Sequence, residues 1–396
     1  MIRNIGQLLT VENGLGLRER VSILIEGEKI SGIGRLRPRP GALVIDAEGG
    51  VVMPGLVDAH THLVFAGSRA DEMAQRLGGA SYEEIARWGG GIRRTVAAVR
   101  AASEDELYEA AQTRIASLVT TGTTTVEIKS GYGLSWQNEL KMLKVIKRLR
   151  ETTLIDIVPT FLGAHAFPPG RSRREYVEEI IGEMLPTVAA QNLADFCDVF
   201  MEGMAFNRRE TEAIFKAAQR HGLKLKIHAD ELSNCGGAAV AGKFHATSAD
   251  HLIHTGKDGI RRLKKGKVVP VLLPGTALFL QIKKRPDVKT MMRLKLPIAL
   301  ASDFNPGTCM ITSLFIILAL GCLVYGLPVE RAIAGVTINA ARALGLGERI
   351  GSLKPGKQAD LLLLRLKSYE EIPYYFGQPF VKTVIKRGVI VYEQDR

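Results

Sequence analysis

Cysteine is scarce in this sequence, and its spacing fits neither a zinc ribbon nor a disulfide framework. The 396 residues include four cysteines with no CxxC pair among them: Cys197, Cys235, Cys309 and Cys322. Disulfide-rich chains belong to oxidising compartments, so this scatter predicts a reducing, cytoplasmic setting. The first residues, MIRNIGQLLT, also lack the basic and then apolar layout of a secretory signal.

Long hydrophobic runs are also rare. The run at residues 314–325 (LFIILALGCLVY) is shorter than the ~20 apolar residues that cross a bilayer. Glycines and a proline interrupt or follow it, at Gly321, Gly326 and Pro328. We therefore expect a buried helix and no membrane span, and the apolar surface of that helix would also suit contact between subunits.

Acidic residues are outnumbered by basic ones, 41 against 53, which gives a formal net charge of +12. Such a balance is compatible with nucleic acid or with a small anionic ligand. The basic clusters at residues 171–174 and 261–267 have no interleaved aromatic residues and accompany no nucleic-acid motif. We expect them to be solvated surface, and we expect no nucleic-acid partner.

The composition that remains is that of a globular protein with a large core, 46% hydrophobic and 24% charged. From residue 51 onward, short apolar runs alternate with segments of helical period, as in repeated βα units. Strands are predicted near residues 51–58, 123–130, 154–163, 194–202, 223–230, 248–253, 267–274 and 296–303. Helices fit between them, for instance at 104–119 after a Ser103 cap and at 208–220. Eight such units predict an α/β fold, a (β/α)8 TIM-like barrel.

The two ends of the chain have a different pattern of predicted secondary structure. Alternating strands without helices occur at residues 21–34 and 42–50, and again at 359–366 and 380–393. We expect both termini to combine into a small β-sandwich domain beside the barrel. The predicted division is 1–54 and 349–396 for the two parts of the sandwich, and 55–348 for the barrel.

Candidate metal ligands occur where the predicted strands end, which is the functional rim of a barrel. The first strand runs into DAHTH, where His60 and His62, two apart in extended backbone, face the same way. Other strand ends add His228, His251 and Asp303. Imidazoles with a carboxylate suit zinc, or iron, better than magnesium or calcium. A metal there would lower the pKa of bound water and polarise a carbonyl, so the pattern predicts hydrolysis.

At this point the sequence resembles a known family. PGLVDAHTHLVFAG, the histidine of the fifth strand and SDFNPG after the eighth are similar to the amidohydrolase superfamily. Within it, the chain resembles the imidazolonepropionase family from about residue 45 to 360, through DAHTHLVFAGSRADE, EIKSGYGL, TFLGAHAFP, KIHADEL, SADHL and ALASDFNPGT. The resemblance implies hydrolysis of the cyclic amide of 4-imidazolone-5-propanoate, a small anionic heterocycle, to N-formimidoyl-L-glutamate in histidine degradation. It also implies a homodimer.

The resemblance further implies the residues of the site. One zinc or iron ion would be held by His60, His62, His228 and Asp303. The substrate would be surrounded by Arg69, Tyr132, His165, Glu231, Asn305, Gly307 and Thr308. A second metal is not expected, because binuclear relatives use a lysine on strand four and the stretch DVFMEGM offers Glu202 instead.

Each substrate residue has a physical rationale and a plainer alternative. Arg69 could hold the propanoate group in a bidentate pair, or be a surface arginine. Tyr132, between two glycines, could donate to the ligand, or be a turn tyrosine. A neutral His165 could donate to the ring, or be a core histidine. Residues 305–308 are expected to open the helix after strand eight, with free N–H groups that favour an anion.

In the expected mechanism, Asp303 helps to deprotonate a water that attacks the ring carbonyl, and the cyclic amide opens. His251 would polarise the carbonyl, and Glu231 would orient the water or move a proton to the ring nitrogen. Two other functions stay open: a deaminase of a nucleobase-like ring, since the metal set is shared, and an inactive scaffold. A residue that holds an anion, Arg69, argues against the first, and the complete ligand set argues against the second.

Overall fold

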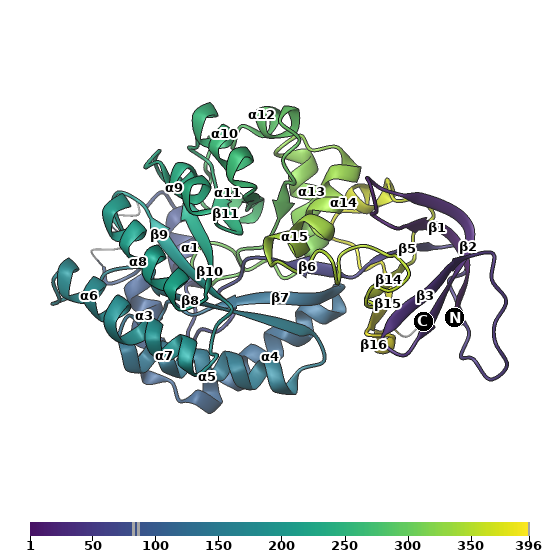
Figure 1. The fold of residues 1–396 in the computed structure, drawn as a ribbon, viewed down its shortest axis with the longest axis horizontal. Helices are drawn as coiled ribbons and strands as arrows, with labels where there is room; N and C mark the ends of the chain where they lie inside the picture. The colour runs from purple at the N-terminus through teal and green to yellow at the C-terminus, as the bar shows by residue number, and fades with distance from the viewer. Residues whose placement is uncertain (81–83, 85–87, 395–396) are drawn as a thin grey trace.

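Two eight-stranded sheets, one parallel and one mixed, organise the molecule. The structure, a computed structural model, describes residues 1–80, 84 and 88–394. In Figure 1 the parallel sheet and its helices occupy the left and centre, and the mixed sheet lies at the right with both ends of the chain.

The parallel sheet is the predicted barrel. Its strands follow one another in chain order: β6 (Leu56–Asp58), β7 (Thr123–Lys129), β8 (Asp156–Ala164), β9 (Phe196–Met201), β10 (Lys224–Ala229), β11 (Ser248–His251), β12 (Val269–Leu272) and β13 (Ala299–Leu300). The first and last strands meet just beyond their ends, where Thr61 and Phe304 form a parallel bridge and the Asp303 amide donates to the His60 carbonyl at 3.0 Å. The eighth strand is much shorter than the sequence predicts, but the barrel closes.

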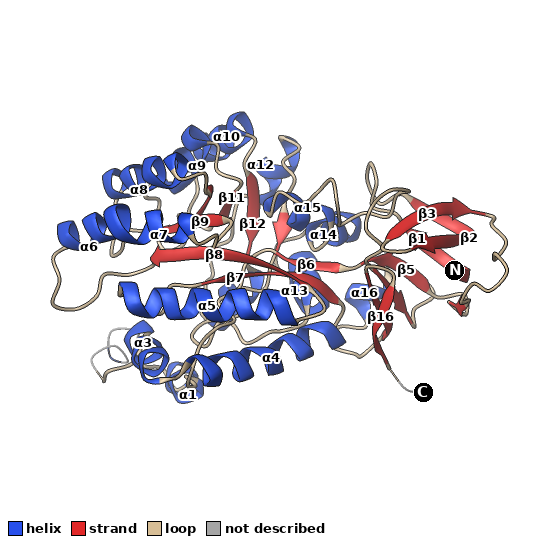
Figure 2. Ribbon diagram, turned by 60° about the horizontal axis from the view of Figure 1, so that its bottom comes forward, coloured by secondary structure: helices blue, strands red, loops and turns tan. Residues whose placement is uncertain are grey.

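Helices surround the barrel, as Figure 2 shows. They are α1 (Ala70–Leu77), α3 (Ile92–Ala101), α4 (Glu104–Thr120), α5 (Trp136–Thr152), α6 (Arg173–Glu179), the π-helix η1 (Ile180–Met184), α7 (Leu185–Ala190), α8 (Arg208–Arg220), α9 (Gly237–Phe244), α10 (Lys257–Gly266), α11 (Pro274–Phe279), α12 (Val288–Arg293), α13 (Leu314–Leu323), α14 (Val329–Gly335), α15 (Ile338–Ala343) and α16 (Glu371–Tyr374). The predicted helix at 104–119 is α4. Ser103 and Glu106 cap it reciprocally, and Leu107, Ala111, Ile115 and Leu118 are buried.

The mixed sheet joins the two ends of the chain. Its strands are β1 (Ile2–Leu9), β2 (Leu17–Glu26), β3 (Lys29–Gly34), β4 (Ile45–Asp46), β5 (Val51–Pro54), β14 (Leu361–Leu364), β15 (Val381–Lys386) and β16 (Val389–Glu393). The order is β16-β15-β14-β5-β1-β2-β3, with β4 paired to β1. N-terminal β5 and C-terminal β14 are antiparallel neighbours, so both termini build one sheet.

A single glycine separates the two sheets. The sequence predicts one strand at 51–58, but β5 belongs to the mixed sheet and β6 to the barrel, with Gly55 between them. The Gly55 amide donates to the Asp360 carbonyl and the Leu56 amide to the Gly122 carbonyl, each at 3.0 Å. A Cβ at Gly55 would lie 2.4 Å from the Thr124 hydroxyl, so this close crossing requires glycine.

A charge cluster around the buried Asp156 joins the sheets at the opposite end of the barrel from the rim. Asp156, the first residue of β8, accepts from Lys386 of β15 at 3.0 Å, from Arg387 at 2.5 Å and from Arg349 at 3.0 Å. Lys386 also donates to Asp360 at 2.7 Å. The contact between the two sheets is therefore partly ionic.

The apolar run near residue 314 forms α13, whose side chains are mostly buried, although Leu323 at its end is 69% exposed. Among the helices in the described part of the chain, none combines the length and the hydrophobicity needed to cross a membrane.

Candidate active site

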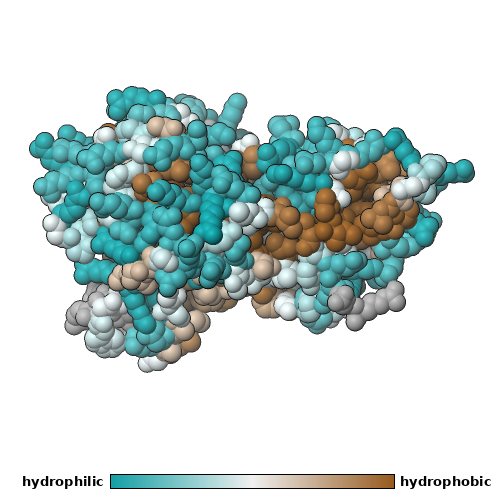
Figure 3. All heavy atoms as spheres, turned by 90° about the horizontal axis from the view of Figure 1, so that it is seen from below, coloured by the Kyte–Doolittle hydropathy of each residue, from teal (hydrophilic) through white to brown (hydrophobic). Residues whose placement is uncertain are grey.

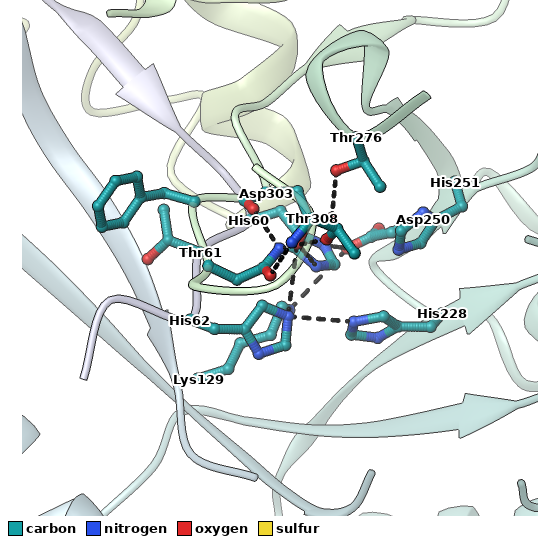
Figure 4. Close-up of polar contacts among 12 residues, drawn as sticks. His60, Thr61, His62, Lys129, His228, Asp250, His251, Thr276, Asp303 and Thr308 are labelled. Carbon is teal, nitrogen blue, oxygen red and sulfur yellow. Dashed lines mark hydrogen bonds and ion pairs between the residues drawn. The ribbon is translucent and has the colours of Figure 1, made fainter. Parts of the chain in front are cut away.

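The His60–His62 pair lies in extended backbone directly after β6. The alternation of the strand turns both imidazoles to one side, and Thr61 to the other, where its hydroxyl donates to the Glu127 carbonyl at 2.6 Å. His228, on β10, completes a buried cluster in which one ligand nitrogen from each histidine lies within 4.8 Å of the others. Figure 4 shows the three rings converging, with Asp303 above them.

The distances in this cluster suit a tetrahedral metal ion. His62 Nε2 lies 3.4 Å from His228 Nε2, and Asp303 Oδ1 lies 3.5 Å from His60 Nε2 and 3.6 Å from His62 Nε2. Ligand atoms at bond lengths of about 2.0–2.1 Å in a tetrahedron are roughly 3.3 Å apart. His60 Nε2 is buried without a hydrogen-bond partner, which is costly unless a metal takes its lone pair. Three imidazoles and a carboxylate therefore fit one zinc or iron ion.

Two of the histidines have a carboxylate behind them. His60 Nδ1 lies 2.6 Å from Asp250 of β11, and His228 Nδ1 lies 3.1 Å from Asp198 of β9. A carboxylate at Nδ1 holds the proton there and leaves Nε2 as the ligand atom, an arrangement common around protein-bound metals. Asp198 is not among the residues predicted from the sequence.

Beneath these carboxylates lies a buried ionic network. Lys129 donates to Glu127 at 2.9 Å and to Asp198 at 2.8 Å. Lys226 donates to the Ala59 carbonyl at 2.8 Å and lies 3.3 Å from Glu127. Period two explains the placement, because Glu127 and Lys129 share one face of β7, and Lys226 and His228 share one face of β10. The charged residue at every second position of these buried strands is the signal that could have revealed the network.

Burial sets the protonation of the ring nitrogens. It lowers the pKa of His60, His62 and His251 well below the usual value, so all three are neutral. Burial also lowers the pKa of His228, but Asp198 outweighs it and the pKa ends above the usual value. Neutral imidazoles have the lone pair that a metal requires.

Asp303 lies at the rim on a strained backbone, with a φ of 52°. Its Oδ2 accepts from the Thr276 hydroxyl at 2.5 Å, which leaves Oδ1 directed at the histidines. Burial raises the pKa of its carboxyl to about 6, so Asp303 can exchange a proton near neutrality. Thr276 is a second site residue that is absent from the sequence predictions.

Glu231 and His251 lie beside the cluster. His251 Nδ1 is 3.6 Å from Glu231 Oε1, and the His251 ring centroid is 5.3 Å from that of His228. Burial raises the pKa of Glu231 to about 8, which favours its protonated form at neutral pH. Glu202 fixes the loop after Glu231 by accepting from the Leu232 amide at 2.9 Å. Glu202 therefore has a structural contact there and touches none of the cluster histidines.

Tyr132 and His165 form an aromatic wall next to His62. The His165 ring is stacked on that of His62 at 5.1 Å between centroids, and Tyr132 lies 5.6 Å from His62. The loop that carries Tyr132 is held by a buried carboxylate, Glu139, which accepts from the Gly131, Gly133 and Leu134 amides. Burial lowers the pKa of His165 to about 3, so its ring is neutral as well.

Arg69 directly precedes α1, and its side chain lies largely inside the protein, 10% exposed. Its guanidinium pairs with Glu72 at 2.8 Å and lies against Gly307, on which a Cβ would approach Nη1 to 2.1 Å. The surface-arginine alternative is therefore wrong, and Arg69 contacts the loop after strand eight.

The loop at residues 305–308 does not open a helix, contrary to the expectation from sequence. It is a tight turn in which Asn305 Oδ1 accepts from the Gly307 and Thr308 amides at 2.8 Å each, and α13 begins only at Leu314. The Asn305 side-chain nitrogen also donates to the Thr308 hydroxyl at 2.7 Å. The amides expected to be free for an anion are therefore already paired, and Asn305 holds the shape of the loop.

Comparison with known proteins places the chain among metal-dependent hydrolases. The profile of the Amidohydrolase family matches residues 51–391. An imidazolonepropionase from Cupriavidus necator is 45% identical over 93% of this chain and 89% of its own. Imidazolonepropionases from Geobacillus kaustophilus and Shewanella frigidimarina are 46% and 43% identical over 95% and 96% of this chain, and over 91% and 95% of their own lengths.

Solved structures share the fold at much lower identity. A 5-methylcytosine deaminase from Klebsiella pneumoniae, liganded with 5-fluorocytosine, superposes with a TM-score of 0.77 at 20% identity, over 100% of this chain and 98% of its own. An atrazine chlorohydrolase from Arthrobacter aurescens, complexed with zinc, has a TM-score of 0.73 at 16% identity, over 99% and 95%. These likenesses establish the architecture, because one fold supports many chemistries.

Proposed function

The chain belongs to the imidazolonepropionases of the amidohydrolase family, and from this we propose that it opens the ring of 4-imidazolone-5-propanoate by hydrolysis of the cyclic amide. The product is N-formimidoyl-L-glutamate, within histidine degradation. The observation that carries the proposal is the buried cluster of three histidines and Asp303, with Arg69 on the same rim of the barrel.

We propose that His60, His62, His228 and Asp303 hold one metal ion, zinc or iron. The ligand distances, the unpaired Nε2 of His60 and the two backing carboxylates support this set. Such a metal supplies Lewis acidity and lowers the pKa of a water ligand. A single ion is proposed because strand four offers Glu202 and no lysine, and because the buried Lys129 is already paired with two carboxylates.

In the proposed reaction, the chain supplies the proton transfers. Asp303 accepts a proton from the attacking water, while Thr276 holds Oδ2. His251 donates to the ring carbonyl and steadies the oxyanion that forms there. Glu231, protonated at neutral pH, gives its proton to the leaving ring nitrogen. Their mutual distance of 3.6 Å lets the two side chains act on one substrate.

The remaining residues are proposed to bind the substrate. Arg69 takes the propanoate carboxylate in a bidentate pair, which suits the planar guanidinium. Tyr132 and His165 flank the ring beside His62. In the loop after strand eight, Asn305, Gly307 and Thr308 form the facing wall, and Gly307 provides the space into which Arg69 fits.

The proposal is tested by a turnover assay with 4-imidazolone-5-propanoate, generated in situ because the compound is labile. Loss of the ring absorbance, appearance of formiminoglutamate and sensitivity to a chelator are expected. The Asp303→Asn variant should lose at least about 10²-fold in kcat, since it cannot accept the proton, while it keeps the circular dichroism spectrum of the wild type. Near-wild-type turnover by this variant would contradict the mechanism. If the wild type instead deaminated a nucleobase and did not open the ring of 4-imidazolone-5-propanoate, the deaminase function would be supported in place of the proposed one.

We also propose that the chain divides into a terminal β-domain, residues 1–54 and 349–396, and a barrel, 55–348, and that it works as a cytoplasmic homodimer. The four free cysteines support the compartment. Figure 3 shows apolar atoms gathered over the terminal sheet and the adjoining part of the barrel, a surface suited to a second subunit. Light scattering on the purified protein tests the dimer, and a monomeric mass would refute it.

A further inference from the structure

Glu72 is a buried carboxylate that has no role in the proposed reaction. It lies on the first turns of α1 and is 2% exposed. Its Oε2 accepts from Arg69 Nε and Nη2, both at 2.8 Å. The amide of Gly91, at the start of α3, lies 3.2 Å from both carboxylate oxygens. A carboxylate is retained in such a place only when charged or N–H donors surround it, so Glu72 and Arg69 depend on each other.

The pair with Glu72 decides how Arg69 is oriented. Glu72 takes the edge of the guanidinium formed by Nε and Nη2, and the second edge, Nη1–Nη2, is the one that another carboxylate could use. Nη1 is the guanidinium atom that lies nearest to Gly307. A side chain at Gly307 would leave no room, since its Cβ would lie 2.1 Å from Nη1 and 2.8 Å from Cζ. Arg76, about two helical turns after Arg69, donates to the Gly307 carbonyl at 3.1 Å. Arg69, just before α1, and Arg76, within it, therefore both contact Gly307 in the loop after strand eight.

We infer that Glu72 is a positioning residue, which holds the Arg69 guanidinium against Gly307 so that its Nη1–Nη2 edge is ready to receive the carboxylate of the substrate. This inference rests on the proposed function, and it adds a residue to the carboxylate subsite of the same site. An arginine free to sample many rotamers loses entropy when it binds, and fixing it beforehand removes that loss from the binding step. Glu72 thus contributes to recognition of the propanoate chain and has no part in opening the ring.

The test compares two neighbouring carboxylates of α1. Glu72→Gln keeps the size of the side chain but removes its charge. Asp71→Asn makes the same change one residue earlier, where the carboxylate pairs with Arg94 at 2.6 Å and is 55% exposed. The Glu72→Gln variant should raise KM for 4-imidazolone-5-propanoate about tenfold and change kcat less than twofold, because only the fixed orientation of the Arg69 guanidinium is lost. The Asp71→Asn variant should behave as the wild type.

A pair of inhibitors separates the carboxylate subsite from the rest of the site. Imidazole-4-propanoate has the ring and the carboxylate, and 4-ethylimidazole has a comparable ring and chain without it. In the Glu72→Gln variant, the dissociation constant of the first should rise about tenfold and that of the second should stay constant. Equal weakening of both, a fall in kcat alone, or the same effect in Asp71→Asn would overturn the inference.

A second variant guards against a folding defect in Glu72→Gln. Gly307→Ala leaves Glu72 in place and displaces Arg69 directly, so it should weaken imidazole-4-propanoate and spare 4-ethylimidazole. Unchanged affinity for both ligands would overturn the inference. Calorimetric binding of these ligands does not require turnover. A wild type that binds them selectively but does not hydrolyse 4-imidazolone-5-propanoate would therefore refute the proposed function while the role of Glu72 stands.

Discussion

Replacing Asp156 by asparagine should loosen the junction between the barrel and the terminal sheet. Burial alone would raise the pKa of Asp156, but Lys386, Arg387 and Arg349 lower it to about 2, from 3.8. One pKa unit corresponds to about 1.4 kcal/mol, so the ionised carboxyl stabilises the folded protein by about 2 kcal/mol. The loss stays near this value because Lys386 keeps its pair with Asp360, and because Arg349 and Arg387, about half exposed, can return to water.

The effect has a defined dependence on pH. The folded pKa of Asp156 lies below the unfolded pKa, so its stabilisation is fully present above about pH 5 and is lost as the pH falls through about 2. The difference in free energy of unfolding between the wild type and Asp156→Asn should therefore be constant from pH 7 to pH 5 and shrink to roughly half at pH 3.

Urea unfolding of the metal-free protein, followed by circular dichroism at 222 nm, measures this difference. The control is Asp195→Asn, the same substitution in an exposed pair with Arg150 at 3.4 Å, where a change below about 0.5 kcal/mol is expected. A difference below about 0.5 kcal/mol for Asp156→Asn at pH 7, or one that grows as the pH falls from 5 to 3, would refute the reasoning.

Three further predictions concern the site and the barrel. Asp198→Asn removes the charged partner of His228 Nδ1, so the affinity for the metal, measured in competition with a chelator, should fall about 10–100-fold. An unchanged affinity would show that Asp198 does not support the metal ligand His228. Glu231→Gln should lower kcat/KM about 10²–10⁴-fold at unchanged metal content, whereas a loss confined to KM would assign it to binding only. Ser103→Ala breaks the reciprocal cap of α4 and should lower the free energy of unfolding by about 1 kcal/mol, measured by thermal unfolding. The control is Ser135→Ala, at the start of α5, where the serine accepts no backbone hydrogen bond and the change should be nearly neutral. Equal effects of the two substitutions would contradict the assignment of Ser103 as a cap.

The sequence predicted what is periodic or local. Strand ends that carry His60, His62, His228 and Asp303 could be found because parallel strands deliver their C-terminal residues to one rim. The helix at 104–119 could be found because Ser103 and an apolar stripe mark it.

Long-range partners were beyond prediction. Nothing local shows that Asp198 faces His228 or that Glu72 faces Arg69, since each pairing depends on how elements pack. The sequence does not show that the strand is interrupted at Gly55, because the apolar run continues through it. The interruption depends on contact with Thr124, which lies about 70 residues later in the chain. The turn at Asn305 resembles a helix cap in sequence, and only its hydrogen bonds to Gly307 and Thr308 distinguish the two.

The pairing of β5 with β14 has a consequence for the order in which the protein can form. The N-terminal strands emerge first from the ribosome, but β14 follows about 300 residues later, which at 5–20 residues per second is a delay of roughly 15–60 s. During that interval one edge of the nascent sheet has no partner, and it is the edge formed by β5, which leads through Gly55 into the first metal-binding strand. Only the synthesis of β14 therefore covers this edge of β5, just before the segment that carries His60 and His62, and a chain released before β14 is made has first strands that are open to aggregation.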